Sequence, residues 1–326
     1  MAASLPLKCE VSDGMLRGMS GGGAVDAGTQ RRLAVVVNPA KIDDLAQTKE
    51  FIEEKCRADG WHVTWHETTK DEPGESQARQ VVAEGAQLVC SLGGDGTVRA
   101  VAAGLVDGEI PLGILPGGTG NLLARNLGVP VDDLTAALRV ALAGTSRKVD
   151  VGSVRWDDGP EQIFLVIAGM GLDARMIGDA DERIKKAVGW PAYLLSGLRG
   201  LFDPGFSARI ASPGRREGSR RARAVVVGNC GQLPGGLDLM PGAKLDDGLL
   251  DLILAAPRGL FGWLGVVREL VTGRGNRSLR RFAADAAEIR LGRPVLAQLD
   301  GDPVGLRTTM SVRVRAGALT VLAPAQ

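Results

Sequence analysis

The sequence contains few of the side chains that most often bind metals or form disulfides. Among its 326 residues there are four cysteines and two histidines. The cysteines lack the spacing of a metal site or a redox motif, and so long a chain is not expected to depend on disulfides, so we expect a reducing, cytoplasmic setting. The histidines, His62 and His66, share one face of a predicted strand in "GWHVTWHET". A zinc pair is the alternative, but the chain has no further histidine, and we favour a solvated strand face.

The chain also lacks an excess of charge and a long apolar run. Its 39 basic and 38 acidic residues give a formal net charge of +1, which argues against a nucleic-acid partner. The longest apolar stretches, "GLLDLILAAP" and "GLFGWLGVV", are shorter than the ~18 residues that cross a bilayer. The first thirty residues have no apolar segment of the signal-peptide kind. We therefore expect a soluble globular protein that at most lies on a membrane surface.

The pattern along the chain predicts two domains after a mobile tail at 1–30, which is rich in glycine and small residues. From 31 to 148, strand-like runs such as "RLAVVVNP" and "QLVCSLGG" alternate with helical patterns, which predicts a parallel sheet covered by helices. From 149 to 316, short strand-like runs at hairpin distances predict a β-rich domain, with helical segments near 182–201 and 261–272. We expect the last residues, about 317–326, to return to the first domain.

Two glycine-rich corners carry the clearest chemical signal. "SLGGDGT" and "ILPGGTGN" each follow a predicted strand, where ligands of α/β sheets bind. Glycines there let backbone N–H groups approach an anion, and the following helix adds partial positive charge. Two such corners favour a nucleotide phosphate site. Neither corner is a Walker A loop. The alternative is that both are tight turns without a ligand. Asp95 in the first corner cannot hold a phosphate directly and indicates a magnesium-linked or proton-accepting role.

A competing motif lies in "FLVIAGMGLDA", where Gly169, Gly171 and Ala174 match the dinucleotide fingerprint. That fingerprint requires a strand ending in an acid about 20 residues later. The chain instead continues with "ERIKKAVGWPAYLL", a basic helical pattern within the β-rich half. We therefore do not favour a dinucleotide site.

Several motifs in order resemble those of the soluble bacterial lipid kinases that carry a diacylglycerol-kinase catalytic domain, kin of sphingosine kinases and, more distantly, of NAD kinases. They are "VVNP", "SLGGDGT", "ILPGGTGNLLARNLG", "FLVIAGMGLDA", "KKAVGWPAYLLSGL", "VVVGNCGQLPGGLDLMPGAKLDDGLLDL" and "LDGD". The resemblance spans Arg31 to Pro324. It implies an α/β plus β fold in two domains, an NAD-kinase-like nucleotide-binding domain and a β-sandwich-like domain, with ATP in the cleft between them. It also implies ATP- and Mg2+-dependent phosphoryl transfer to a lipid hydroxyl, with diacylglycerol giving phosphatidic acid.

The resemblance also implies particular residues. The nucleotide contacts would be Asn38, Pro39, Thr68, Gly93, Gly94, Asp95, Gly96, Thr97, Gly118 and Thr119. In "KLDDGLLD" the ligands of a structural magnesium ion would be the Lys244 carbonyl, the Asp247 carboxylate and the Leu249 carbonyl. Without the family context, this segment reads equally well as an ordinary Asp-Gly turn.

The general base is expected near the end of the chain. Family members carry Asp-Gly-Glu there, whereas this chain has Asp300-Gly301-Asp302, whose second acid reaches about 1.5 Å less far. We rank Asp302 and Asp300 as catalytic candidates ahead of Asp95, which corresponds to the base of sphingosine kinases. A type I′ hairpin turn is the structural alternative for this segment.

A second departure is "NPAKID", where family members often have Asn-Pro-x-Ser-Gly. Our hypothesis is that Lys41 directs its ammonium group at the phosphates instead of a backbone cradle. Two arginine clusters could bind anionic lipid at a membrane surface or could simply be solvated faces. They consist of Arg215, Arg216, Arg220, Arg221 and Arg223, and of Arg274, Arg277, Arg280 and Arg281.

Other functions remain open at this point. The acceptor could be another lipid, such as a sphingoid base, a monoglyceride or a prenol, or a soluble metabolite. The chain could also be a nucleotide-binding regulator without catalysis. We further expect a lipid partner, peripheral contact with the inner face of the membrane and, by resemblance, a homodimer.

Overall fold

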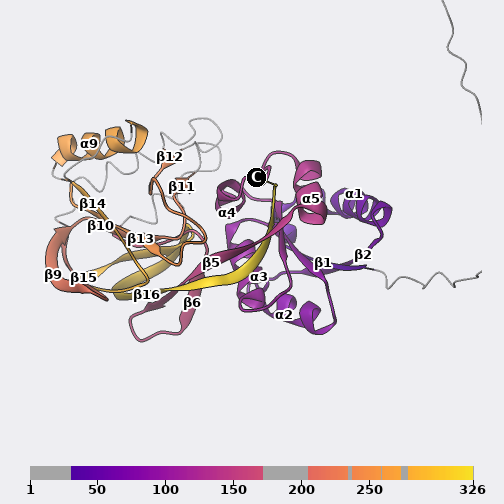
Figure 1. Ribbon diagram of the computed structural model, residues 1–326, viewed down its shortest axis with the longest axis horizontal. Coiled ribbons are helices and arrows are strands. Elements are labelled where there is room, and N and C mark those ends of the chain that lie inside the picture. Colours follow the sequence, from indigo (N-terminus) through magenta and orange to yellow (C-terminus); the bar gives the residue numbers. More distant parts are fainter. Residues whose placement is uncertain (1–30, 172–204, 234–236, 258, 273–277, 326) are drawn as a thin grey trace, which may run out of the picture. The chain divides into compact units, whose positions relative to one another are not determined.

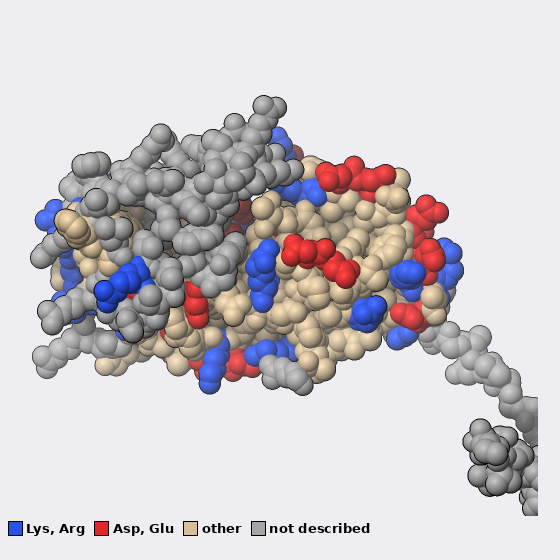
Figure 2. All heavy atoms as spheres, turned by 90° about the horizontal axis from the view of Figure 1, so that it is seen from above, with Lys and Arg blue, Asp and Glu red and all other residues tan. Residues whose placement is uncertain are grey.

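The computed structural model describes residues 31–171, 205–233, 237–257, 259–272 and 278–325 (Figure 1). The predicted tail at 1–30 and the predicted helical segment at 182–201 lie outside the described residues. Within the described part of the chain, no helix is both long and apolar enough to cross a membrane. Among the described residues on the face shown in Figure 2, basic and acidic side chains are interspersed, as the balanced composition predicts.

The first part of the chain alternates strands and helices as the sequence predicts. Its strands are β1 (Arg31–Val37), β2 (Trp61–Glu67), β3 (Leu88–Gly93) and β4 (Leu112–Pro116), and its predicted helices are α1 (Leu45–Ala58), α2 (Glu75–Ala83) and α3 (Asp95–Leu105). The strands pair in parallel in the order β2-β1-β3-β4. The whole of β3 is buried, which explains why its residues are apolar apart from Ser91. The carboxyl ends of all four strands therefore lie at one edge of the sheet.

Three short elements of this part were not predicted. They are the 3-10 turn η1 (Pro39–Lys41) and the helices α4 (Leu122–Asn126) and α5 (Leu134–Ala143). Helix α5 begins at an Asp133 cap, whose carboxylate accepts a hydrogen bond of 2.9 Å from the Ala136 N–H. Helix α4 has only five residues and begins at Asn121, which adopts a left-handed conformation with φ of 47°. Such a short helix has too little periodicity to be found from the pattern of its side chains.

The second part is built mainly of strands. They are β5 (Thr145–Trp156), β6 (Glu161–Phe164), β7 (Ile167–Met170), β8 (Phe206–Ser212), β9 (Arg215–Ala222), β10 (Ala224–Gly228), β11 (Gln232–Leu233), β12 (Leu237–Asp238), β13 (Leu250–Ala255), β14 (Leu279–Ala284), β15 (Ala286–Leu299) and β16 (Asp302–Ala323). The helix α9 (Gly259–Thr272) falls where a helix was predicted. A separate core lies inside this part and includes Phe164, Met170, Ile289 and Met310. The predicted order, an α/β part followed by a β-rich part, is confirmed.

Strand β16 joins the two parts into one sheet. It pairs antiparallel with β15 through its first half and with β5 from Met310 to Ala323 (Figure 1, yellow). Near its end, Val321 pairs in parallel with Leu112 of β4. The described strands of both parts, apart from the small β11–β12 pair, therefore belong to a single 14-stranded sheet.

Two alternative sites from the sequence gain no support. Strand β7, which carries the dinucleotide-like glycines, pairs antiparallel with both β10 and β15 instead of in a parallel βαβ unit. On the edge strand β2, the side chain of His62 is exposed and the ring of His66 lies 3.3 Å from the Thr64 hydroxyl. Within the described residues, no group of three or more His, Cys, Asp or Glu side chains could hold a metal ion.

Candidate active site

The two glycine corners lie side by side at the carboxyl ends of β3 and β4. The Gly117 N–H donates a hydrogen bond of 2.9 Å to the carbonyl of Gly93. A Cβ atom on Gly118 would lie only 2.6 Å from the Cα of Gly94. The close approach of the two backbones is therefore the first reason why these positions are glycine. The same packing places the first turn of α3, with N–H groups that have no acceptor inside the helix, at this corner.

The predicted contact Asn38 follows β1 at the same edge. Its N–H donates to the Leu92 carbonyl at 2.9 Å, and its Nδ2 donates to Thr97 Oγ1 at 3.5 Å. Thr97 is buried, and a Cβ atom on Gly93 would lie 2.7 Å from its hydroxyl. Asn38 thus connects the end of β1 to the first glycine corner.

The other predicted nucleotide contacts surround this corner. Pro39 opens η1, which ends at the exposed Lys41. Thr68 follows β2, is buried and donates its N–H to the Val37 carbonyl at 2.8 Å. Thr119 is exposed in the second corner. The structure therefore brings the residues expected around a nucleotide to one edge of the sheet.

Asp95 connects the two glycine corners through its carboxylate. Its Oδ1 accepts a hydrogen bond of 2.5 Å from the Leu122 N–H, and a Cβ atom on Gly120 would lie 2.4 Å from Oδ2. Burial raises the pKa of Asp95, and the charge of Asp300 raises it further, whereas the Leu122 amide opposes the shift. Asp95 is therefore a partly buried carboxyl group that ionises less readily than a solvated one.

Asp300 is buried at the turn between β15 and β16. Its Oδ1 accepts hydrogen bonds of 2.9 Å from the N–H groups of Val166 and Ile167, and its Oδ2 accepts one of 3.0 Å from Leu165. Burial raises the pKa of Asp300, while the charge of Arg99 and the three amides lower it. These contacts hold the segment between β6 and β7, which interrupts the apolar run "EQIFLVIAG". Asp300 thus has the environment of a structural anchor.

The turn itself has the geometry of the hairpin alternative. Asp300 and Gly301 have φ values of 48° and 91°, and Leu299 pairs with Asp302 across them. These are the features of a two-residue type I′ turn. The hairpin and functional interpretations of "LDGD" therefore describe the same segment, because the turn places one acid inside and the next outside.

Asp302 is the outward acid of this turn. Its side chain is 56% exposed, and a Cβ atom on Gly96 would lie 3.1 Å from its Oδ2. The carboxylate therefore lies against the first turn of α3, beside the glycine corners. Arg99 Nη2 donates to the same oxygen at 2.7 Å.

Arg99 was not recognised in the sequence and connects α3 to this turn. Besides Asp302, its Nη1 donates to the Leu299 carbonyl at 2.8 Å and lies 3.7 Å from Asp300 Oδ2. Its side chain is 19% exposed. The available signal was a lone basic residue in "DGTVRAVAAGL", one turn after Asp95 in an otherwise apolar helix.

The predicted magnesium loop is anchored by a second unrecognised residue, Asp150. This buried carboxylate accepts hydrogen bonds of 2.7 Å from the N–H groups of Gly248 and of Gly317 in β16. Within the loop, Asp247 Oδ1 accepts a hydrogen bond of 3.1 Å from the Leu249 N–H. Burial raises the pKa of Asp251, and the charge of Asp247 raises it further.

Carboxylates and main-chain carbonyls are the donors that Mg2+ prefers, so the donor set of this loop fits the ion. The carbonyls would be those of the predicted ligands Lys244 and Leu249. Lys244 also lines a hollow of about 250 Å3 with Asn126 of α4 and with Arg147, which pairs with Asp246 at 2.8 Å. Helix α4 follows the second glycine corner in the chain, and its last residue, Asn126, shares this hollow with Lys244 of the loop.

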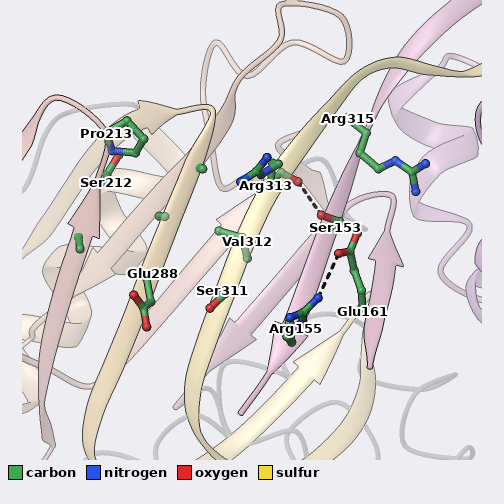
Figure 3. A pocket seen from close by; sticks show the side chains of 13 residues that line it. Ser153, Arg155, Glu161, Ser212, Pro213, Glu288, Ser311, Val312, Arg313 and Arg315 are labelled. Carbon is green, nitrogen blue, oxygen red and sulfur yellow. Dashed lines mark hydrogen bonds and ion pairs between the residues drawn. The ribbon is translucent and has the colours of Figure 1, made fainter. Parts of the chain in front are cut away.

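A larger hollow of about 750 Å3 lies on the outer face of the β-rich sheet (Figure 3). Its polar lining includes Arg155, which lies 3.8 Å from Glu161, and Arg313, whose carbonyl accepts a hydrogen bond of 3.3 Å from the Ser153 hydroxyl. None of the predicted nucleotide, magnesium or base residues lines it. The candidate active site is therefore the corner between β3, β4, α3 and the β15–β16 turn.

In comparisons with known proteins, two family models match successive parts of the chain. Residues 32–154 match the model of the diacylglycerol kinase catalytic domain, and residues 165–323 match that of the YegS C-terminal NAD kinase beta sandwich-like domain. These matches confirm the predicted fold class, including its NAD-kinase-like and sandwich-like character.

Similar proteins cover most of the chain. A Pseudomonas aeruginosa PAO1 protein named "Probable lipid kinase YegS-like" is 35% identical over 269 residues, which is 81% of this chain and 84% of that protein. One of the same name from Pseudomonas syringae pv. tomato is 32% identical over 305 residues, covering 91% and 95%. The crystal structure of a diacylglycerol kinase from Bacillus anthracis has a TM-score of 0.72 at 26% identity, covering 90% of this chain and 97% of that one.

Proposed function

The chain belongs to the family of YegS-like lipid kinases with a diacylglycerol kinase catalytic domain, and on this premise we propose that it transfers the γ-phosphate of ATP to a lipid hydroxyl in a Mg2+-dependent reaction, with diacylglycerol as the acceptor. The observation that carries the proposal is the approach of Asp302 to the first turn of α3, beside both glycine corners. In this proposal Asp302 would accept the proton beside a backbone whose N–H groups would bind the phosphates.

The phosphates of ATP would lie against the N–H groups of the Gly93–Thr97 and Gly117–Thr119 corners. Asn38 and Thr68, at the ends of the neighbouring strands, would contact the rest of the nucleotide. Phosphoryl transfer depends mainly on positioning and charge neutralisation, which amide groups at a helix N-terminus supply. A magnesium ion at the Asp247 loop would stabilise that loop, and one bound with ATP would neutralise phosphate charge.

We assign the general base to Asp302. The lipid hydroxyl oxygen attacks the γ-phosphorus, the bond from that phosphorus to the β–γ bridging oxygen breaks, and ADP leaves with the electron pair. The hydroxyl proton passes to the Asp302 carboxylate. Asp302 is exposed, whereas Asp300 has its oxygens occupied by three amides. Asp95 is the third candidate. Because its pKa is raised, it stays protonated to a higher pH than an ordinary carboxyl group, and in that form it cannot accept a proton.

Because the acceptor is a membrane lipid and ATP is cytoplasmic, we place the reaction at the inner face of the membrane. The test is Mg2+-dependent transfer of labelled γ-phosphate to diacylglycerol, a sphingoid base, a monoglyceride and a prenol in mixed micelles. We expect labelled phosphatidic acid with the wild type and its loss in Asp302→Asn. The matched control is Asp107→Asn, because Asp107 is also an exposed acid that pairs with an arginine, Arg315. A wild type that binds ATP but labels only a water-soluble acceptor, or none, would contradict the proposal.

A further inference from the structure

The hollow on the outer face of the β-rich sheet has no role in the proposed reaction. Its volume of about 750 Å3 is within the range of small-molecule sites. Its lining comes from strands β5, β8, β15 and β16 and from the start of β6. The side chains of these strands therefore decide what the hollow can bind.

The alternation of side chains along β5 and β16 explains why this lining is polar. In "GSVRW" and "SVRVR", the apolar residues Val154, Trp156 and Val312 belong to the buried core of the β-rich part. The residues between them therefore lie on the outer face of the sheet. These outer residues are serines and arginines, namely Ser153, Arg155, Ser311, Arg313 and Arg315.

The strand register places four of these side chains in a checkerboard. Arg155 lies opposite Ser311, and Arg313 lies opposite Ser153. The two arginines are therefore diagonal neighbours on adjacent strands, and each has a short side chain beside it (Figure 3). Long side chains can meet across such a diagonal, so both guanidinium groups can reach one shared ligand.

Two of the five charged lining residues are compensated from outside the hollow. Glu288 pairs with Arg290 at 2.7 Å, and Arg315 pairs with Asp107. The charges that face a ligand are therefore mainly those of the other three lining residues, which are Arg155, Glu161 and Arg313.

These three residues leave one positive charge without a partner. Arg155 lies 3.8 Å from Glu161, which is too far for a hydrogen bond. Arg313 is exposed, and within the described residues no acid pairs with it. The lining also contains the Ser212 hydroxyl, which is buried and has no hydrogen-bond partner in the described part of the chain. The hollow thus offers guanidinium and hydroxyl groups whose hydrogen bonds the protein does not use.

We propose that this hollow is a second ligand site, which binds the phosphate group of a phosphate monoester between Arg155 and Arg313. A guanidinium group presents parallel N–H donors that match two phosphate oxygens, and the Ser311 hydroxyl can donate to the third. A carboxylate has only two oxygens and would not use all of these donors. The remaining volume would hold the organic part of the ligand. This inference does not depend on the proposed function, because no residue assigned to ATP, magnesium or the general base lines the hollow.

The first test measures binding of a soluble phosphate. The whole protein is titrated calorimetrically, in a buffer without phosphate, with inorganic phosphate and with glycerol 3-phosphate. We expect Arg313→Ala to bind roughly tenfold or more weakly than the wild type, and Arg313→Lys, which keeps the charge without the paired donors, to lie between them. The matched control is Arg209→Ala, because Arg209 is an exposed arginine of β8 that does not line the hollow. It should bind as the wild type does.

The second test distinguishes a free ligand from a lipid headgroup. The same proteins are sedimented with vesicles of phosphatidylcholine alone or mixed with phosphatidic acid. Binding of glycerol 3-phosphate that depends on Arg313 would identify a soluble ligand. Binding that depends on Arg313 and is seen only with phosphatidic acid vesicles would identify a lipid headgroup, and either result supports the site.

Three results would overturn the proposal. The first is a wild type that binds none of the phosphate probes. The second is binding that Arg313→Ala leaves unchanged, because the phosphate would then lie elsewhere, for example at the glycine corners. The third is an equal loss of binding in Arg209→Ala and Arg313→Ala, since the effect would then be one of overall charge.

Discussion

Asp300 and Asp302 lie two residues apart, and replacing each by asparagine should have opposite consequences. Asp300 accepts three backbone N–H groups at 2.9–3.0 Å and is buried, whereas Asp302 is 56% exposed. Asparagine at position 300 keeps one acceptor oxygen and replaces the other with an NH2 group. If the oxygen stays toward Val166 and Ile167, the NH2 group faces the N–H of Leu165. One buried donor is then left without an acceptor.

The expected loss of stability follows from these contacts. An unsatisfied buried donor costs about 1–3 kcal/mol, and breaking a buried charged pair costs about 3–5 kcal/mol. The Arg99–Asp300 distance of 3.7 Å is long for an ion pair, so we expect a total at the lower end of the summed range, roughly 4 kcal/mol. In a chain of this size, each kcal/mol lowers the Tm by about 2 °C, which gives roughly 8 °C. Asp302→Asn removes only an exposed ion pair and should lower the Tm by no more than about 2 °C.

Thermal unfolding followed by circular dichroism and the micelle kinase assay test both variants together. We expect Asp300→Asn to be destabilised, and Asp302→Asn to be stable but inactive. The reasoning would be refuted if Asp300→Asn unfolded at the wild-type temperature while losing all activity. Asp300 would then act in the chemistry and not as an anchor.

Three further predictions concern residues around the same site. Because Arg99 positions Asp302, Arg99→Ala should lower kcat by roughly tenfold or more with little change in KM for ATP, and Arg99→Lys should retain part of the wild-type kcat. Asp302→Asn should lower kcat by a smaller factor in the Arg99→Ala background than in the wild type. Burial raises the pKa of Asp95, so the folded state binds a proton more tightly than the unfolded chain. The stability of the wild type should therefore fall as the pH rises from about 4 through the raised pKa. Asp95→Asn, scanned across the same pH range, should show a smaller slope, because Asp300 and Asp251, whose pKa values are also raised, still contribute. Asp150→Ala leaves two glycine amides without their acceptor and should reduce the free energy of unfolding by roughly 2–4 kcal/mol in urea titrations, and an unchanged midpoint would contradict this.

Local sequence patterns were sufficient for much of the fold. The apolar run "RLAVVVNP" predicted a strand, and the structure buries its residues from Leu33 to Val37 in β1; the spacing in α1 places Ile52 and Cys56 on the buried side. Both glycine corners were predicted to follow strands, at the edge of the sheet where ligands bind. These features depend on residues close together in the chain.

Other features depend on residues far apart in the chain. The runs "AAEIRLG" and "PVLAQLD" form one strand, β15, with an irregularity between Arg290 and Val295, because its partners continue across the interruption. The apolar run "EQIFLVIAG" is divided into β6 and β7 where Asp300, more than 130 residues later, binds the backbone. No local pattern contains this information.

The sequence by itself determined the type and order of most elements, the glycine corners and the set of acids that could serve as base. The tertiary structure decided which acid lies inside and which outside, and it showed that Arg99 joins α3 to a turn 200 residues later. The physical reason is that strand periodicity and turn preferences are local, whereas the burial of a carboxylate depends on long-range pairing. In this chain that pairing is made by β16, which joins both parts in one sheet and places Asp302 at the glycine corners.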